Sequence, residues 1–318
     1  MIFKTLPQNG ASWHSPLLYS LEFDQREEQV EVEIYDLLSS STLGCIKLYN
    51  LSSAEIDIAP YIRSYMLNNL LDKHTAVIQH SADACRVVIR AKGVESEPRL
   101  LFRSDISTGQ IGFLSTIIDQ GTVAVGEVIR LTLLATQSIN LVVTRPSEGG
   151  IEVYSFKAEG VPCEIALPIN VAQEGENILI RATCDGEYVG LCRYRVVGRD
   201  ESAVRLAWVN SKGGMECYTF PQSVKRSIVV KSEDVEGECG WYRRITGSSV
   251  VRRLVMIGAT QGEVDRVLDA LLSPKVYRCD GWESMAVQLL TDTLNYDDHG
   301  RLRRLEFDIN EEWKGGAI

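Results

Sequence analysis

The feature that most constrains the fold is a period-two alternation of apolar and polar residues. It is clearest in Val30-Glu31-Val32-Glu33-Ile34, where the residues between the apolar ones are acidic. Successive side chains of a β-strand point to opposite faces, so this segment predicts a strand with one buried and one solvated face. Similar segments are Leu17–Phe23, Leu43–Tyr49, Ala76–Gln79 and Cys85–Ala91. We therefore expect a mainly β, multi-domain protein in which residues 1–120 form a β-sandwich or barrel.

Residues 121–199 repeat the alternation at shorter intervals. Gly and Asp both tolerate positive φ, so Asp185-Gly186 suits a two-residue hairpin turn. Short strands joined by tight turns are typical of an immunoglobulin-like β-sandwich, which we expect here. The expected strands are Val128–Leu134, Asn140–Thr144, Glu152–Phe156, Cys163–Ile169, Asn177–Thr183 and Leu191–Val197.

The pattern changes again in residues 200–318, which predict an α+β domain. Val204–Val209 and Met215–Phe220 enclose a glycine-bearing turn and predict a hairpin. This domain either folds alone or packs with residues 1–120 as one discontinuous unit, and both arrangements stay open. Further strands are expected at Arg252–Ile257, Lys275–Cys279, Met285–Leu294 and Leu302–Ile309.

Two helices are expected among these strands. A short one is expected near Tyr61–Leu71, after Pro60. The other spans Gln261–Leu272, because a capping box precedes it and Ser273-Pro274 stops it. The capping box is formed by Thr260 and Glu263. The apolar face that we expect to pack on the sheet comprises Val264, Val267, Leu268, Leu271 and Leu272.

The chain carries no sequence signal for a membrane or for secretion. No apolar run approaches the roughly 18 residues that span a bilayer, and the first residues lack the basic and apolar parts of a secretory signal. We therefore expect assembly in the cytoplasm. The eight cysteines are widely spaced without a C-x-x-C pair, which favours free thiols over disulfides or zinc ligands. Cys45 and Cys85 stand among apolar residues and are expected to be buried.

The net charge of −10 disfavours nucleic acid as a partner. The charge is unevenly distributed. Residues 1–200 hold 17 basic and 25 acidic side chains, a net −8, and residues 201–318 hold 16 and 18, a net −2. The last third of the chain is therefore able to face an acidic neighbour, such as another copy of the first two thirds, although an ordinary solvated surface explains the same numbers.

Motifs that carry chemistry are missing. The four histidines show no H-E-x-x-H or H-x-H spacing, and His299 in Asp297–Gly300 is expected in a solvated turn. No phosphate-binding loop is present, and Gly247-Ser248-Ser249 lacks the glycine of a nucleophile elbow and is expected in a loop. We therefore expect a protein that is not an enzyme, with no catalytic residue, no cofactor and no metal.

Aromatic residues supply the candidate interaction surface. Trp208, Tyr218, Trp241 and Trp282 all fall in the last third of the chain. Large aromatic side chains anchor protein interfaces and stack on sugars. For Trp208 the competing interpretation is packing in the core, since Leu206 and Phe220 beside it are apolar. Trp241 and Trp282 each follow a glycine, which favours surface positions.

One hairpin also carries a family resemblance. Trp208 to Phe220 reads W-x-N-x-x-G-G-x-x-x-Y-x-F, which resembles a hairpin of prophage-encoded tail or virion proteins of Bacteroidetes. Ser53–Arg63 is similar to a segment of the same group. Residues 200–318 also loosely resemble the ring-building domain of distal tail proteins of long-tailed phages, although that domain is N-terminal in the family.

The resemblance implies a phage-derived tail or baseplate protein that assembles in the cytoplasm and ends in the virion. Its partners would be further copies of itself or neighbouring tail proteins. The alternative is a cell-surface adhesion or carbohydrate-binding module, which the immunoglobulin-like region and the tryptophans favour.

Overall fold

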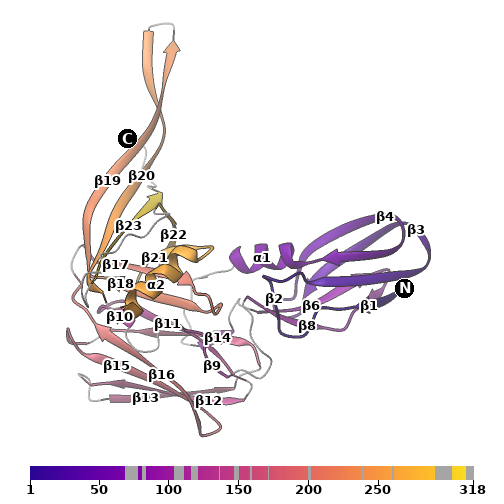
Figure 1. The fold of residues 1–318 in the computed structure, drawn as a ribbon, viewed down its shortest axis with the longest axis horizontal. Helices are drawn as coiled ribbons and strands as arrows, with labels where there is room; N and C mark the ends of the chain where they lie inside the picture. Colours follow the sequence, from indigo (N-terminus) through magenta and orange to yellow (C-terminus); the bar gives the residue numbers. More distant parts are fainter. Residues whose placement is uncertain are drawn as a thin grey trace.

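The computed structural model confirms a mainly β protein with several sheets (Figure 1). No helix among the residues it describes is long and apolar enough to cross a membrane. The described residues are 1–68, 78–80, 84–103, 111–115, 121–135, 137–146, 150–157, 160–170, 172–199, 202–237, 240–259, 261–290 and 303–312.

The N-terminal sheet is built around one long hairpin. Its seven strands run in the order β1-β3-β6-β8-β2, with β4 on β3 and β7 on β6. The predicted alternation is confirmed in β3, where Val32 and Ile34 are fully buried and Glu31 is exposed. The strands are β1 (Ile2–Thr5), β2 (Ala11–Ser12), β3 (Leu18–Asp36), β4 (Ser41–Asp57), β6 (Ala84–Ala91), β7 (Val94–Glu95) and β8 (Arg99–Phe102).

The expected short helix is present as α1 (Ala59–Asn68). A carboxylate oxygen of Asp57 accepts hydrogen bonds from the backbone N–H groups of Ala59 and Leu17, at 3.0 and 2.9 Å. Asp57 therefore fixes both the start of the helix and its position against the sheet. The end of the expected range, at Leu71, lies outside the described residues.

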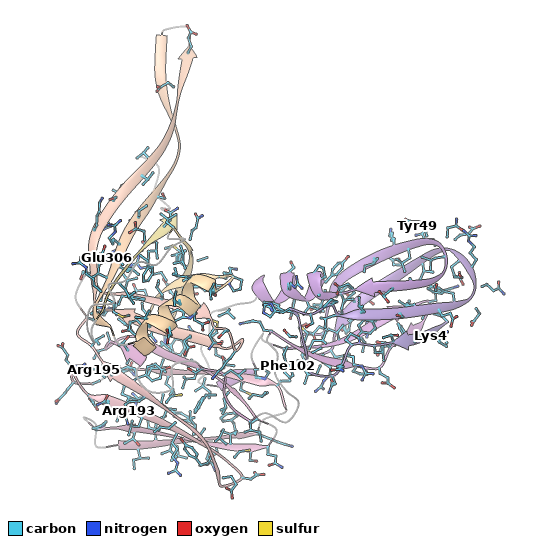
Figure 2. All side chains as sticks on the ribbon, viewed as in Figure 1. Lys4, Tyr49, Phe102, Arg193, Arg195 and Glu306 are labelled. Atoms are coloured by element: carbon cyan, nitrogen blue, oxygen red, sulfur yellow. The ribbon has the colours of Figure 1, made fainter. Side chains whose placement is uncertain are left out.

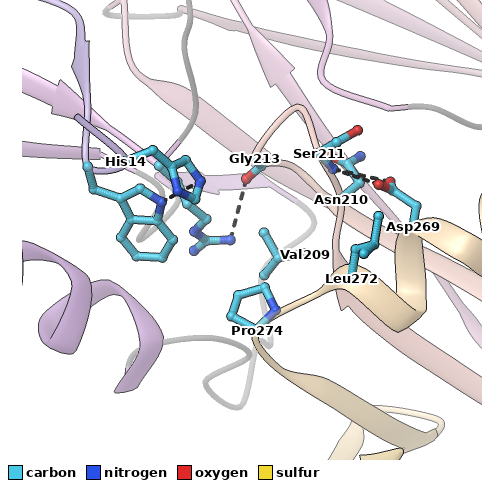
Figure 3. A pocket seen from close by; sticks show the side chains of 10 residues that line it. His14, Val209, Asn210, Ser211, Gly213, Asp269, Leu272 and Pro274 are labelled. Atoms are coloured by element: carbon cyan, nitrogen blue, oxygen red, sulfur yellow. Dashed lines mark hydrogen bonds between the residues drawn. The ribbon is translucent and has the colours of Figure 1, made fainter. Parts of the chain in front are cut away.

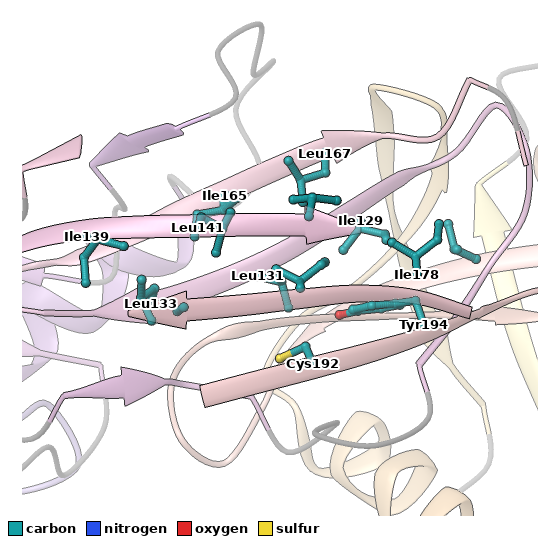
Figure 4. Close-up of a cluster of buried hydrophobic side chains, with 14 of the residues drawn as sticks. Ile129, Leu131, Leu133, Ile139, Leu141, Ile165, Leu167, Ile178, Cys192 and Tyr194 are labelled. Atoms are coloured by element: carbon teal, nitrogen blue, oxygen red, sulfur yellow. The ribbon is translucent and has the colours of Figure 1, made fainter. Parts of the chain in front are cut away.

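Two further sheets pack face to face around the largest core, which includes Leu131, Leu141 and Ile180 (Figure 4). The hairpin turn at Asp185-Gly186 is confirmed, with φ of 49° and 88°. One sheet has the order β10-β16-β15-β12-β13 and the other β5-β14-β11-β9. The strands are β5 (Ile78–His80), β9 (Gly112–Phe113), β10 (Gly121–Val123), β11 (Val128–Leu134), β12 (Ser138–Arg145), β13 (Gly150–Lys157), β14 (Pro162–Pro168), β15 (Asn177–Cys184) and β16 (Glu187–Val196).

The C-terminal sheet has seven strands in the order β18-β17-β21-β22-β23-β20-β19. Only Pro221 separates β18 from β19 along the chain, although the two strands form opposite edges of the sheet. The sheet therefore has to curl to bring its edges together. The strands are β17 (Val204–Val209), β18 (Met215–Phe220), β19 (Gln222–Gly237), β20 (Gly240–Ala259), β21 (Val276–Asp280), β22 (Glu283–Leu289) and β23 (Arg303–Glu312).

The second predicted helix is confirmed over its whole range as α2 (Gln261–Leu272). Val264 is fully buried in the sheet's core, and Leu268 packs against that core. The prediction was wrong for Leu272, which is 82% exposed because the helix ends there and turns its last side chain away from the sheet. Thr260 and the side chain of Glu263, which were expected to cap the helix, lie outside the described part.

The largest difference from the sequence-based expectation is the length of β19 and β20. Arg252–Ile257 is only part of β20, which begins at Gly240 and pairs with β19 along nearly its whole length. Gly247-Ser248-Ser249, expected in a loop, lies within β20 opposite Val229, Val230 and Lys231. Pairing with the apolar residues of β19 overrides the weak strand propensity of Gly and Ser.

Candidate interaction surfaces

The hairpin β17–β18 does not provide the expected aromatic surface. Trp208 is fully buried and Tyr218 is 3% exposed, so the interpretation of these two residues as a surface was wrong. Both pack in the core between the C-terminal sheet and α2, where the rings of Phe220 and Phe307 meet edge to face with centroids 5.1 Å apart. The competing interpretation, packing in the core, is the observed one for Trp208.

The polar residues of this hairpin join the C-terminal sheet to the two sheets that pack face to face, β10-β16-β15-β12-β13 and β5-β14-β11-β9, which we call the central sheets. We call the contact between the hairpin β17–β18 and the central sheets the joint. The side-chain amide of Asn210 donates to the backbone carbonyl of Leu114 and to the carboxylate of Glu216, both at 2.7 Å. The hydroxyl of Ser115 donates to the other oxygen of the same carboxylate. At Gly214 a Cβ atom would collide with the carbonyl of Leu114, so only glycine fits there.

A buried ion pair completes this joint. The guanidinium of Arg205 lies 3.4 Å from the carboxylate of Glu127, and the two side chains are 1% and 5% exposed. Arg205 also donates to the Thr219 hydroxyl at 2.8 Å and to the carbonyl of Val128 at 2.8 Å. The Thr219 hydroxyl in turn donates to Glu127 at 2.6 Å. Because buried charges are costly without partners, this network requires β17 and β18 to stay seated on the central sheets.

Trp282 also belongs to this joint in part. It lies in the turn between β21 and β22 and is 36% exposed. The guanidinium carbon of Arg130, from β11, lies 5.9 Å from the centre of its ring, and Arg130 is itself paired with Glu164 at 2.8 Å. One part of the Trp282 ring thus faces a buried cation of the central sheets.

The hairpin β19–β20 extends beyond the rest of the molecule (Figure 1). Among the described residues, β23 pairs with β20 only between Ser249 and Ala259. Closer to the tip of the hairpin, Lys231–Gly237 and Gly240–Gly247 form a ribbon of two strands. We call these residues the arm. The predicted surface residue Trp241 lies in the arm, opposite Glu236, and its side chain is outside the described part.

Apolar residues are exposed where the arm leaves the sheet. Ile228, Val229 and Val230 are 58%, 43% and 47% exposed, although three consecutive aliphatic residues normally place at least one side chain in a core. They lie on β19, which is an edge strand. An open edge presents unpaired backbone groups. This segment therefore combines exposed aliphatic side chains with a free backbone edge, which are two properties of a protein-binding strand.

The outer face of the five-stranded sheet is a second exposed surface. Ile151 and Val153 on its edge strand β13 are 67% and 59% exposed. Arg181 on β15 and Arg193 and Arg195 on β16 of the same sheet are exposed, and Figure 2 shows Arg193 and Arg195 at the periphery of the molecule. Within the described residues no carboxylate forms an ion pair with these three arginines. This face is therefore basic in an acidic protein.

A cavity of about 250 Å³ lies between the N-terminal sheet and the C-terminal sheet (Figure 3). The indole of Trp13 donates to a ring nitrogen of His14 at 2.8 Å, and Arg103 donates to the carbonyl of Gly213 at 3.4 Å. The carboxylate of Asp269 accepts from the backbone of Ser211 at 3.1 Å. These polar groups thus hydrogen-bond within the cavity wall, and the volume is below that of a usual ligand pocket.

The cysteines are free thiols in every described case. Burial raises the pKa values of Cys217 and Cys279, the latter to about 12, which keeps both protonated and unreactive. Cys45, expected to be buried, is exposed because it lies on the solvent face of β4. Its thiol donates to Glu31, which raises its pKa. No group of His, Cys, Asp and Glu side chains suited to a metal ion occurs in the described part. His299 lies outside it.

Comparison with known proteins gives no further guide to these surfaces. The sequence matches no protein-family model and no curated protein.

Proposed function

We propose that this chain is a non-enzymatic structural protein, derived from a phage tail or baseplate, that assembles through its β19–β20 arm. The observation that carries the proposal is the arm itself. A two-stranded ribbon is marginally stable in water, so a ribbon with exposed aliphatic residues at its base gains most when another protein covers it.

The joint beneath the arm supports the same proposal. In the hairpin that resembles the prophage tail proteins, Trp208 fills the core, Asn210 bridges two sheets and Gly214 fits against Leu114. Asn210 and Gly214 of this motif thus seat the C-terminal sheet on the central sheets, while Trp208 packs in the core beneath α2. We propose that related tail proteins share this joint.

The finer architecture belongs to the proposal as well. We propose an N-terminal β-sandwich or barrel, an immunoglobulin-like central module and a C-terminal α+β unit that presents the arm. Such modules supply several separate contact surfaces on one rigid chain, as a ring or baseplate component requires.

Removal of the arm tests the proposal. Val230 lies opposite Ser248, so residues 231–247 can be replaced by Asn-Gly, which closes a tight hairpin without changing the register. We expect the full chain to form an oligomer, or a complex with the products of adjacent genes, and the shortened chain to elute as a monomer. Light scattering coupled to size-exclusion chromatography measures both.

A matched variant controls for the loss of any apolar surface. Val153→Lys removes an aliphatic residue of similar exposure from the edge strand β13, and it should leave the assembly intact. The proposal fails if the full chain stays monomeric at high concentration and binds none of the neighbouring gene products. Binding of both forms to a glycan array, with no assembly, would instead support carbohydrate recognition.

A further inference from the structure

The free side of β19 is the longest open strand edge in the C-terminal sheet. β19 pairs with β20 alone, so the other side of its backbone has no strand partner among the described residues. Its pairing with β20 is irregular at two places, and the second places Thr246 of β20 as the extra residue. From Lys225 to Gly237 β19 itself therefore has no inserted residue, and its edge is continuous.

Charges are distributed along this edge in a definite order. Lys225, Arg226 and Lys231 come first, and Glu233, Asp234 and Glu236 follow. The aliphatic residues Ile228–Val230 stand between Arg226 and Lys231. Edge strands commonly carry lysines that repel a second strand, but here an equal number of carboxylates accompanies the basic residues. Counted alone, β19 is therefore neutral and its two ends have opposite charge, while Arg244 and Arg243 of β20 lie opposite Glu233 and Asp234 in the register.

We propose that a second copy of this chain docks on this edge, with its own β19 antiparallel to the first across a two-fold axis. This inference rests on the proposed role of the arm in assembly and names its partner. A two-fold contact joins the same surface on both copies, so the surface has to complement itself. An antiparallel arrangement achieves this because it sets the basic end of one strand beside the acidic end of the other.

The residue pairs follow from the symmetry. A two-fold axis through an antiparallel pair passes midway between two identical residues. With Val230 on the axis, Arg226 faces Asp234 of the second copy. With Val229 on the axis, Lys225 faces Glu233, and Ile228 faces Val230. With Val229 on the axis all three aliphatic residues meet at the centre, whereas with Val230 on the axis only Val230 meets its own copy and Val229 faces Lys231. A parallel in-register arrangement would instead set like charges opposite each other.

The open edge of β13 does not have this property. Ile151 and Val153 are at least as exposed as the aliphatic residues of β19, at 67% and 59%. The charged residues of β13 are Glu152 and Lys157, and Glu152 is already engaged by Arg145 and Tyr154. β13 is therefore a matched control, an open aliphatic edge without self-complementary charge.

Charge exchange tests the inference on the full chain. The variant K225E/R226E makes both ends of β19 acidic, and we expect the dimer dissociation constant from sedimentation equilibrium to rise about 100-fold. Adding E233K/D234K restores opposite charges in reversed order and should return the constant to within about tenfold of the original. The variant V153K on β13 should leave it unchanged.

The outcomes separate this inference from the proposed function. The β19 pairing is wrong, and the role of the arm stands, if the chain forms an oligomer whose dissociation constant is the same with K225E/R226E. The same conclusion follows if the quadruple variant K225E/R226E/E233K/D234K is folded by circular dichroism but does not restore the dissociation constant. If the chain is a monomer that binds a neighbouring gene product through the arm, the β19 pairing is again wrong and the role of the arm stands. A monomer that binds nothing overturns both.

Discussion

Two hairpins of the C-terminal sheet, β17–β18 and β19–β20, follow each other directly in the chain but differ sharply in how far their side chains are buried. In β17 and β18 every residue is buried, whereas β19 exposes three aliphatic residues in succession. One residue, Pro221, separates the two hairpins. The comparison teaches that packing against a second layer of strands, here β10 and β11 of the central sheets, decides which edge of the C-terminal sheet is covered, and not the sequence of the edge strand itself.

The second layer is visible in the polar contacts. Strands β10 and β11 lie against β18, and the Thr122 hydroxyl accepts a hydrogen bond from the backbone of Thr219 at 2.9 Å. The Thr132 hydroxyl accepts one from Met215 at 2.9 Å. On β19 the corresponding backbone edge meets no other strand among the described residues. The predictions below set the covered hairpin against the open one.

The largest effect is expected in the core of the covered hairpin. Trp208→Ala should lower the free energy of unfolding by about 4 kcal/mol, because a fully buried indole leaves a cavity. Urea denaturation followed by circular dichroism measures the change. Trp282→Ala, at a partly exposed turn, should cost less than about 1 kcal/mol. Equal losses for the two variants would contradict the assignment of Trp208 to the core.

The ion pair of the joint should give the next effect. Arg205→Met leaves the buried carboxylate of Glu127 without its cation and should cost about 3 kcal/mol. Arg199→Met is the matched control, because the Arg199–Asp280 pair is exposed and should contribute less than about 1 kcal/mol. The same denaturation experiment compares them. If the two losses are similar, Arg205 does not hold the joint.

Alkaline pH should weaken the covered part of the sheet. Burial raises the pKa of the Cys279 thiol from 9.0 to about 12, so folding favours the protonated form. The resulting stability is complete below pH 9 and is lost as the pH rises toward 12, with about 1 kcal/mol gone by pH 10. Urea midpoints between pH 8 and pH 10 measure this slope. Cys279→Ala should reduce this slope, and an unchanged slope would assign the effect to another buried thiol such as Cys217, whose pKa burial also raises.

The smallest effect is expected on the open hairpin. Ile228→Thr should change the free energy of unfolding of the monomer by less than about 0.5 kcal/mol, since the side chain is 58% exposed. The measurement has to be made at a concentration that keeps the protein monomeric. A loss above about 2 kcal/mol would show that β19 is covered within one chain, which would remove the contrast between the two hairpins.

Local signals predicted local structure well. The alternation of β3, the turn at Asp185-Gly186 and helix α2 all follow from side-chain periodicity or from turn and helix-stop residues, and the structure confirms them. The apolar neighbours of Trp208 already indicated packing in the core, but no local signal indicated the burial of Tyr218, which depends on α2 and β23 from later in the chain. The pairing of β9 with β11 and of β5 with β14 is long-range in the same sense.

The arm shows why the site itself was harder to predict than the fold. Gly247-Ser248-Ser249 has weak strand propensity, and pairing with its partner residues in β19 makes it a strand. The aliphatic run Ile228–Val230 reads as a buried strand in the sequence. It is exposed because it lies on an edge strand that pairs with β20 alone among the described residues, and no local pattern marks that position.

The single-residue link at Pro221 has a mechanical consequence. A load applied at the end of the arm runs along β19 and reaches Phe220 without any slack segment to absorb it. Both strands of the hairpin carry the load along their backbones, and β20 passes its share to β23 through the ladder that joins them. The covered hairpin acts as the anchor point, and its buried side chains resist the pull. A pull on the arm is thus passed directly to a hairpin in which every residue is buried.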